Sequence, residues 1–154
     1  MVMLDSNIFV IDRFFRNDAL YPPNRVFVER LSEFECAISI FTLLETAGVA
    51  SFNLSAKECE GWLHRFPSIY PIMILSASCM ESESAEEWLK GFVDRVTSNI
   101  TRRMNFGDAI LLSEAEGHHA EALITWNTKD FARRASVPVL SPKVFIESRK
   151  ERHK

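Results

Sequence analysis

The sequence predicts an α/β protein, a three-layer α/β/α domain around a central parallel sheet of four to five strands. Short apolar runs recur along the 154-residue chain without the polar alternation of a half-exposed strand, and helix signals lie between them. Strands that alternate with helices imply crossover connections, which give a parallel sheet covered on both faces. The length suits one domain of this kind and is too short for two ordinary ones.

The predicted strands are apolar segments of strand length. Segments that are uniformly apolar are typical of strands buried on both faces, as in a parallel sheet. They are Val2–Leu4, Cys36–Ile40, Ile72–Leu75, Ala122–Thr125 and Val137–Leu140.

The predicted helices begin at recognisable caps. Pro22-Pro23 suits the first turn of a helix that runs to about Glu35, because a first-turn proline loses no hydrogen bond. Two S-x-x-E patterns match capping boxes, in which side chains satisfy unpaired backbone donors: Ser55 with Glu58, and Ser84 with Glu87.

The C-terminal part of the chain predicts one more helix and a tail. Ser141-Pro142 resembles a cap followed by a first-turn proline, opening a last helix near Val144–Arg149. We therefore expect a single domain over residues 1–147 and a mobile basic tail over residues 148–154.

Composition narrows the function classes. The formal net charge is −3, so nucleic-acid binding would depend on local basic patches or bound cations. Three widely spaced cysteines without a CxxC pattern predict neither a disulfide framework nor a zinc site, and favour a reducing cytoplasm. No apolar stretch approaches the length that spans a bilayer, so we expect a soluble intracellular protein and no membrane partner.

Acidic side chains are expected to converge at one edge of the predicted sheet. In an open parallel sheet, ligands bind beyond the carboxyl ends of the strands. Asp5 follows the first strand, and Asp108 precedes a predicted helix, Ala109–Gly117, that feeds the fourth. Further polar residues are expected at this carboxyl edge of the sheet, which we call the rim: Thr42 and Glu45 after the second strand, and Thr125, Asn127 and Asp130 around the end of the fourth.

Such a cluster points to a divalent cation. Carboxylates a few ångströms apart repel one another, and the usual outcomes are protonation or a bound cation. Carboxylate and amide oxygens without His or Cys suit Mg²⁺ or Mn²⁺ rather than zinc. A cation of this kind bridged to a phosphodiester can polarise phosphorus and activate water.

Four segments then resemble, in order, the motifs of PIN domains. Residues 4–10 (LDSNIFV) resemble the first motif, 38–45 (ISIFTLLE) the second, 105–110 (NFGDAI) the third and 124–131 (ITWNTKDF) the fourth. Residues 138–145 (PVLSPKVF) are similar to the family's strand-then-proline ending. Each motif alone is weak, but four in order across nearly the whole chain form a strong signal.

The resemblance implies a Mg²⁺- or Mn²⁺-dependent endoribonuclease. It implies that Asp5, Glu45 and Asp108 hold metal, with Ser6, Asn7, Thr42 and Thr125 in supporting positions. The family's fourth acidic position aligns with Asn127, so either that ligand is neutral here and a second metal binds more weakly, or Asp130 replaces it by reaching back. Many members of this size are VapC-type toxins, dimeric and silenced by an antitoxin, which implies RNA, an antitoxin and a second copy of the chain as partners.

Basic residues beside the rim are candidate RNA contacts. Arg102 and Arg103 precede Asp108, and Lys129 and Arg133 follow the fourth motif. They could contact phosphates, although a solvated helix face explains them equally well.

Each site residue also has an ordinary structural explanation. Asp5 could simply cap a helix, Asp108 could be a first-turn acid favoured by the helix dipole, and Asn127–Asp130 could be a turn. Glu45 could be a solvent-facing helix residue, but it lies in a largely apolar segment, where a Glu would be costly without a partner or ligand.

The sequence also allows other functions. A PIN-like module that binds RNA or protein without cutting is the main alternative, favoured by Asn127. A haloacid-dehalogenase-like phosphatase is disfavoured because Asn7 stands where its second Asp belongs. A phospho-acceptor receiver is disfavoured because residues 74–76 (ILS) offer no acceptor Asp.

Overall fold

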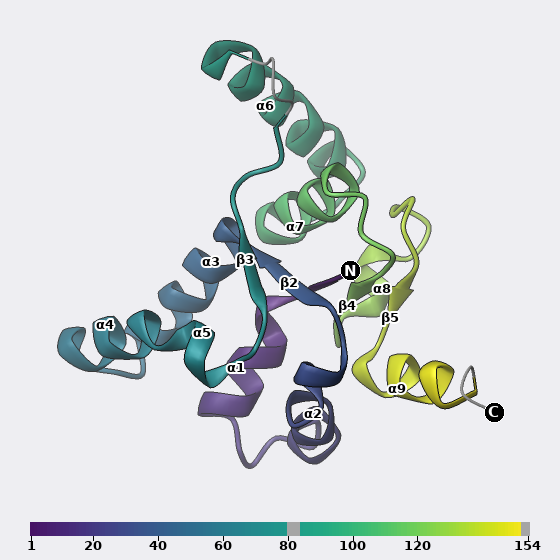
Figure 1. Ribbon diagram of the computed structural model, residues 1–154. Coiled ribbons are helices and arrows are strands. Elements are labelled where there is room, and N and C mark those ends of the chain that lie inside the picture. Colours follow the sequence, from purple (N-terminus) through teal and green to yellow (C-terminus); the bar gives the residue numbers. More distant parts are fainter. Residues whose placement is uncertain (80–83, 152–154) are drawn as a thin grey trace.

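The central sheet has the predicted parallel architecture. The computed structural model describes residues 1–79 and 84–151, and its five strands are all parallel in the order β3-β2-β1-β4-β5 (Figure 1). All five predicted runs contain a strand, and each strand after the first is shorter than its apolar run. The strands are β1 (Val2–Leu4), β2 (Cys36–Ser39), β3 (Met73–Leu75), β4 (Leu123–Ile124) and β5 (Val139–Leu140).

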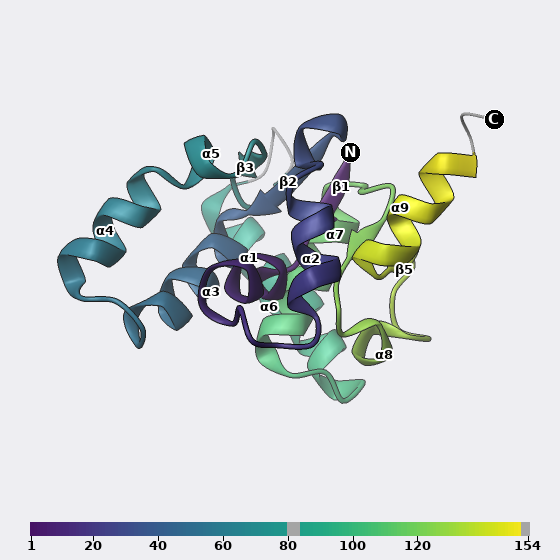
Figure 2. The same cartoon turned by 90° about the horizontal axis from the view of Figure 1, so that it is seen from below.

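Helices cover both faces of the sheet and complete the three layers. Nine α-helices lie in the described part of the chain: α1 (Ser6–Phe14), α2 (Tyr21–Val28), α3 (Ile40–Ser51), α4 (Ala56–His64), α5 (Phe66–Ile69), α6 (Ala85–Thr101), α7 (Phe106–Gly117), α8 (Thr128–Phe131) and α9 (Pro142–Glu151). Helices α2 and α9, which are far apart in the sequence, are in contact and lie side by side in Figure 2.

Two separate apolar clusters form the core, one on each face of the sheet. The alternation of side chains along β1 sends Val2 and Leu4 to one cluster and Met3 to the other. The first cluster joins α1, α2, α4, α5 and α9, and the second joins α6, α7 and α8. The predicted three-layer α/β/α class is therefore confirmed.

Local caps explain where the helices begin. Both predicted capping boxes are present: Ser55 and Ser84 accept the N–H groups of Glu58 and Glu87, whose carboxylates reach back to the cap N–H. Ser141 accepts the N–H of Val144 at 3.3 Å at the start of α9.

Two predicted boundaries differ. The helix that starts near Pro22 ends at Val28 instead of Glu35, because the chain turns through a 3₁₀ segment (Leu31–Glu33) that buries Leu31 before it enters β2. Helix α9 continues to Glu151, so residues 148–151 of the expected mobile tail are helical. Residues 152–154 of that tail lie outside the described residues.

Over residues 1–79 and 84–151, no helix combines the length and the apolar character needed to cross a membrane.

Candidate active site

Asp5 directly follows β1, the central strand, from which the chain adds strands first on one side and then on the other. From the central β1, the chain builds β2 and β3 on one side, and later β4 and β5 on the other. Crevices of open parallel sheets occur at such switch points, beyond the carboxyl ends of the strands. Leu4 pairs with Ile124, and the Asp5 N–H donates to the Ile124 carbonyl at 3.0 Å, so Asp5 and Thr125 leave neighbouring strands side by side.

The Asp5 carboxylate is buried and hydrogen-bonded on both oxygens. Its side chain is 5% exposed. Oδ2 accepts from Thr125 Oγ1 at 2.6 Å and from Asn7 Nδ2 at 2.7 Å, and Oδ1 accepts from Ser6 Oγ at 3.2 Å and weakly from the Asn7 N–H at 3.4 Å. Asp5 thus caps α1, as its ordinary explanation requires, but the cap uses only part of its bonding capacity.

Burial and neighbouring carboxylates raise the pKa of Asp5 to about 6. Desolvation is the largest cause, and repulsion from Glu45 and Asp108 adds to it, while hydrogen bonds from Thr125 and Asn7 oppose it. Asp5, Glu45 and Asp108 therefore lie near enough to one another for their charges to interact at this edge of the sheet.

Glu45 reaches this edge from α3 and faces solvent. A Cβ placed on Gly107 would lie 2.7 Å from Glu45 Oε1, so the carboxylate sits directly against the backbone at the start of α7. Glu45 and its neighbour Leu44 are exposed, Leu44 at 60%. Glu45 is therefore a solvent-facing residue of α3, and this face of the helix borders an open groove toward α7.

Asp108 occupies the first turn of α7. Its backbone N–H donates to Asn105 Oδ1 at 2.9 Å, and Asn105 Nδ2 donates a short hydrogen bond to Asp108 Oδ2. Burial raises the pKa of Asp108 to about 6, with further repulsion from Asp130 and then Glu45, while Asn105 and Arg134 oppose the rise. Asp108 therefore experiences more than the helix dipole, which alone would favour its charged form.

The fourth position has two candidates, and the structure separates their roles. Asp130, on α8, is close enough to raise the pKa of Asp108. Asn127 is exposed and bonded to the same rim through its backbone, since its N–H donates to Thr125 Oγ1 at 2.9 Å. Asp130 thus supplies the negative charge beside Asp108, whereas Asn127 offers a neutral amide near Thr125.

The supporting residues divide into two groups. Ser6, Asn7 and Thr125 contact Asp5 directly, and Asn7 also donates to Thr125 Oγ1 at 3.0 Å. Thr42 is buried at the start of α3, where its hydroxyl lies 3.1 Å from Ser39 Oγ and its N–H donates to the same atom. Thr42 therefore stabilises the start of α3 and lines the groove beside Glu45.

The chemistry of these donors fits a hard divalent cation, while their arrangement is only partly assembled. Carboxylates are the ligands that Mg²⁺ and Mn²⁺ prefer. Among the residues that the structure describes, no three Asp, Glu, His or Cys side chains lie close enough together to hold one ion. Hydrogen bonds hold the carboxylates of Asp5 and Asp108, and Glu45 is exposed. The repulsion among the three carboxylates is therefore limited by their separation and by the raised pKa of Asp5 and of Asp108.

The basic residues beside the rim form a clasp. Arg102 Nη2 donates to the Arg134 carbonyl at 2.7 Å, and Arg134 Nε donates to the Arg102 carbonyl at 2.8 Å. Arg103 and Arg133 adjoin this clasp with φ of 64° and 65°, a backbone region that costs a non-glycine residue about 1–2 kcal/mol. The clasp thus ties the turn before Asp108 to the turn after α8.

The clasp changes the expectation for RNA contacts. Arg102 is committed to backbone carbonyls, so its guanidinium is less available than predicted. Arg103, Lys129 and Arg133 are exposed beside the rim, and their RNA contact stays a prediction.

Sequence reasoning missed two functional neighbours of Asp108. Asn105 binds its carboxylate, and Arg134 is the cation that lowers its pKa. An N-x-x-D pattern before a helix signals the first, since Asn is a favoured cap. Only the tertiary packing of α7 on α8 reveals the second.

Comparison with known proteins identifies the fold through solved structures. No protein-family model matches the chain, and a search of curated proteins also finds no match. Solved structures match over nearly the whole length. FitAcB from Neisseria gonorrhoeae is 16% identical with a TM-score of 0.60, and VapBC2 from Rickettsia felis, bound to a DNA fragment from their promoter, is 22% identical with a TM-score of 0.61. A toxin–antitoxin complex from Klebsiella pneumoniae is 23% identical with a TM-score of 0.59.

These matches agree with the sequence motifs. Each covers 92% of this chain and 98% of the matched chain, so no large element is left over on either side. The chain therefore has the PIN-like three-layer fold that its four motifs predict, and shares this fold with VapBC, FitAB and related toxin–antitoxin structures.

Proposed function

We propose that the chain is a Mg²⁺- or Mn²⁺-dependent endoribonuclease, the toxin of a toxin–antitoxin pair. The observation that carries the proposal is that the charges of Asp5, Glu45 and Asp108 interact near the carboxyl edge of the sheet, where burial and repulsion raise the pKa of Asp5 and of Asp108 to about 6. The fold it shares with toxin–antitoxin structures and its four PIN motifs support the same function.

The chain's own residues would divide the work. Asp5, Glu45 and Asp108 would hold the cation, which supplies Lewis-acid activation of water and of the phosphodiester. Ser6, Asn7 and Thr125 orient the Asp5 carboxylate, and Asn105 orients Asp108. Asp130 would add charge at the fourth position, and Arg103, Lys129 and Arg133 would contact RNA phosphates.

The partners follow from the same proposal. The exposed apolar groove between α3 and α7 ends at Glu45, and an antitoxin segment could cover it with apolar side chains while a basic side chain approaches the rim. We propose in addition that the chain acts as a homodimer in the cytoplasm, where its three free cysteines would stay reduced.

Cleavage of total RNA by the purified chain tests the proposal. Cleavage should require Mg²⁺ or Mn²⁺ and stop on addition of chelator, and Asp5→Asn should abolish it. Asp94→Asn is the matched control, because Asp94 is an exposed carboxylate on α6. Equal cleavage by wild type and Asp5→Asn would end the catalytic assignment.

A catalytically inert module is the second candidate function. It is favoured by the neutral Asn127 and by the absence, among the described residues, of three ligating side chains already close together. Calorimetric titration with Mn²⁺ separates the two functions. A nuclease should show a saturable site that Asp108→Asn removes, and an inert module should show none.

A further inference from the structure

A second polar cavity lies away from the carboxylate rim. It is a half-open pocket lined by the end of α1, the start of α2 and the segment from α4 to α5, and its volume is about 530 Å³. Helix α1 connects it to the rim, since Asp5 and Arg13 stand at opposite ends of this helix. At a rise of 1.5 Å per residue, the two are roughly 12 Å apart along the helix axis. The cavity is therefore a separate feature.

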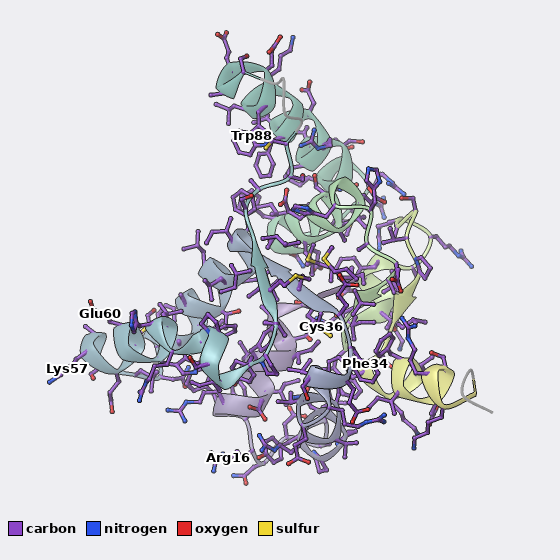
Figure 3. All side chains as sticks on the ribbon, in the orientation of Figure 1. Arg16, Phe34, Cys36, Lys57, Glu60 and Trp88 are labelled. Carbon is purple, nitrogen blue, oxygen red and sulfur yellow. The ribbon has the colours of Figure 1, made fainter. Side chains whose placement is uncertain are left out.

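Its lining is strongly basic. Four arginines line it, Arg13, Arg16, Arg25 and Arg65, against one carboxylate, Asp12. Figure 3 labels Arg16 at the turn between α1 and α2, with its side chain reaching outward from the ribbon. Arginines from the end of α1 and the turn after it, from α2 and from the α4–α5 junction thus line one cavity.

The single carboxylate is already fully engaged. Asp12 Oδ1 accepts from Arg25 Nη1 at 3.1 Å, and Asp12 Oδ2 accepts from the Tyr70 hydroxyl at 3.0 Å. Arg25 also donates to Glu29 on its own helix at 2.8 Å. Asp12 and Arg25 neutralise one another, and the excess charge of the cavity comes from the remaining arginines.

Those remaining arginines have no carboxylate partners in the described parts of the chain. No Asp or Glu of residues 1–79 and 84–150 lies within ion-pair distance of Arg13, Arg16 or Arg65. Glu58, on the packed helix α4, bonds to Ser55, and these hydrogen bonds lower its pKa with a smaller contribution from the charge of Arg13. Arg65 donates Nε to the Gly61 carbonyl at 3.0 Å, which fixes its side chain without neutralising it.

One residue of the lining also carries a buried donor without a partner. Trp62 lines it and is 3% exposed, and its indole N–H has no acceptor among the described residues. Buried polar groups in proteins are nearly always paired, so an orphaned N–H indicates a missing acceptor. The cavity therefore has more donors and more positive charge than its one carboxylate, Asp12, can match.

We propose that this cavity binds a phosphate group. Guanidinium groups match phosphate oxygens in paired hydrogen bonds, which makes arginine the preferred residue for this recognition. The volume falls in the range of small-ligand sites, so a nucleotide or one phosphate of an RNA strand fits. The inference goes beyond the proposed nuclease, because binding here requires neither metal nor cleavage.

Nuclear magnetic resonance of the full chain in chelator tests the site. The probes are inorganic phosphate, adenosine 5′-monophosphate and a short single-stranded oligoribonucleotide. The indole N–H signal of Trp62 should move saturably. Those of Trp88 and Trp126, which donate to the Ser78 carbonyl and to Asn24 Oδ1, are internal references that should stay in place.

Substitutions make the test specific. Arg13→Gln with Arg16→Gln should weaken binding at least tenfold. Lys57→Gln with Lys90→Gln removes the same charge from exposed positions outside the cavity and should leave binding unchanged. An equal urea midpoint for both double variants would show that folding is intact.

The probes distinguish the source of the phosphate. Comparable binding of inorganic phosphate and the mononucleotide would identify a small phosphorylated ligand, and binding of the oligoribonucleotide alone would identify an RNA backbone phosphate. A Trp62 signal that no probe moves, or equal binding by wild type and the arginine double variant, would overturn the proposal. Equal RNA cleavage by wild type and Asp5→Asn would end the nuclease assignment and leave this binding result unchanged, so the two proposals fail separately.

Discussion

Replacing Asp5 by Asn should change how the stability of the metal-free protein depends on pH. The pKa of Asp5 is raised from 3.8 to about 6 in the folded chain, mainly by burial. The folded state therefore holds this proton more tightly than the unfolded state does. The stabilisation is complete below pH 3.8, decreases as the pH rises, and is lost above about pH 6.

The magnitude follows from the size of the pKa change. A rise of about 2 in pKa corresponds to about 3 kcal/mol at 1.36 kcal/mol per pKa unit. Asp5 is almost fully buried, so solvent screens little of this effect. Asn cannot ionise, and the variant should therefore gain about 3 kcal/mol relative to wild type between pH 4 and pH 7. Its lost acceptor for Thr125 and Asn7 adds an offset that does not depend on pH.

Urea unfolding in chelator at half-unit pH steps from 4 to 7.5 measures the difference. Comparing the two proteins at each pH cancels the titration of groups that both contain. Asp94→Asn, which removes an exposed carboxylate from α6, controls for the loss of one charge. Parallel stability curves for wild type and Asp5→Asn would refute the argument that burial and repulsion strain this carboxylate.

Three further changes test the support around the rim. Thr125→Val removes the donor to Asp5 Oδ2 and should lower the free energy of unfolding at pH 7 by about 1–3 kcal/mol, measured by urea unfolding; an unchanged midpoint would show that the bond contributes nothing. Gly107→Ala places a Cβ 2.7 Å from Glu45 Oε1 and should turn this exposed carboxylate away, weakening Mn²⁺ binding in calorimetry while the thermal midpoint stays within a few degrees; unchanged affinity contradicts it. Asn105→Ala removes the cap of α7 and should cost about 1 kcal/mol in thermal unfolding, whereas Asn105→Ser, a neutral cap, should retain most of that stability.

Much of the fold was predictable because its signals are local. Apolar runs identify buried strands, and the Ser55 and Ser84 boxes identify helix starts, since each depends on residues a few positions apart. The end of α2 was not predictable in the same way. Nothing near Val28 breaks a helix, and the chain turns there because Leu31 packs into the core.

The same distinction between local signals and tertiary packing applies to the candidate site. That carboxylates lie along one edge could be predicted from the sequence, because Asp5 follows the first strand and Asp108 begins a helix that leads back into the fourth. Which of these side chains are in contact could not be predicted from the sequence. Glu45 is exposed and places its Oε1 against the backbone of Gly107 on another helix, and Asp130, not Asn127, supplies the charge beside Asp108.

The sequence by itself determined the layers, the strand and helix alternation and the acidic edge, because short-range burial and capping preferences specify them. Only the tertiary structure decided that β4 lies beside β1, which places Thr125 on the Asp5 carboxylate from 120 positions away. It also decided that arginines from three segments surround one cavity. Contacts of this kind depend on how whole helices and strands pack, and no pattern of neighbouring residues encodes them.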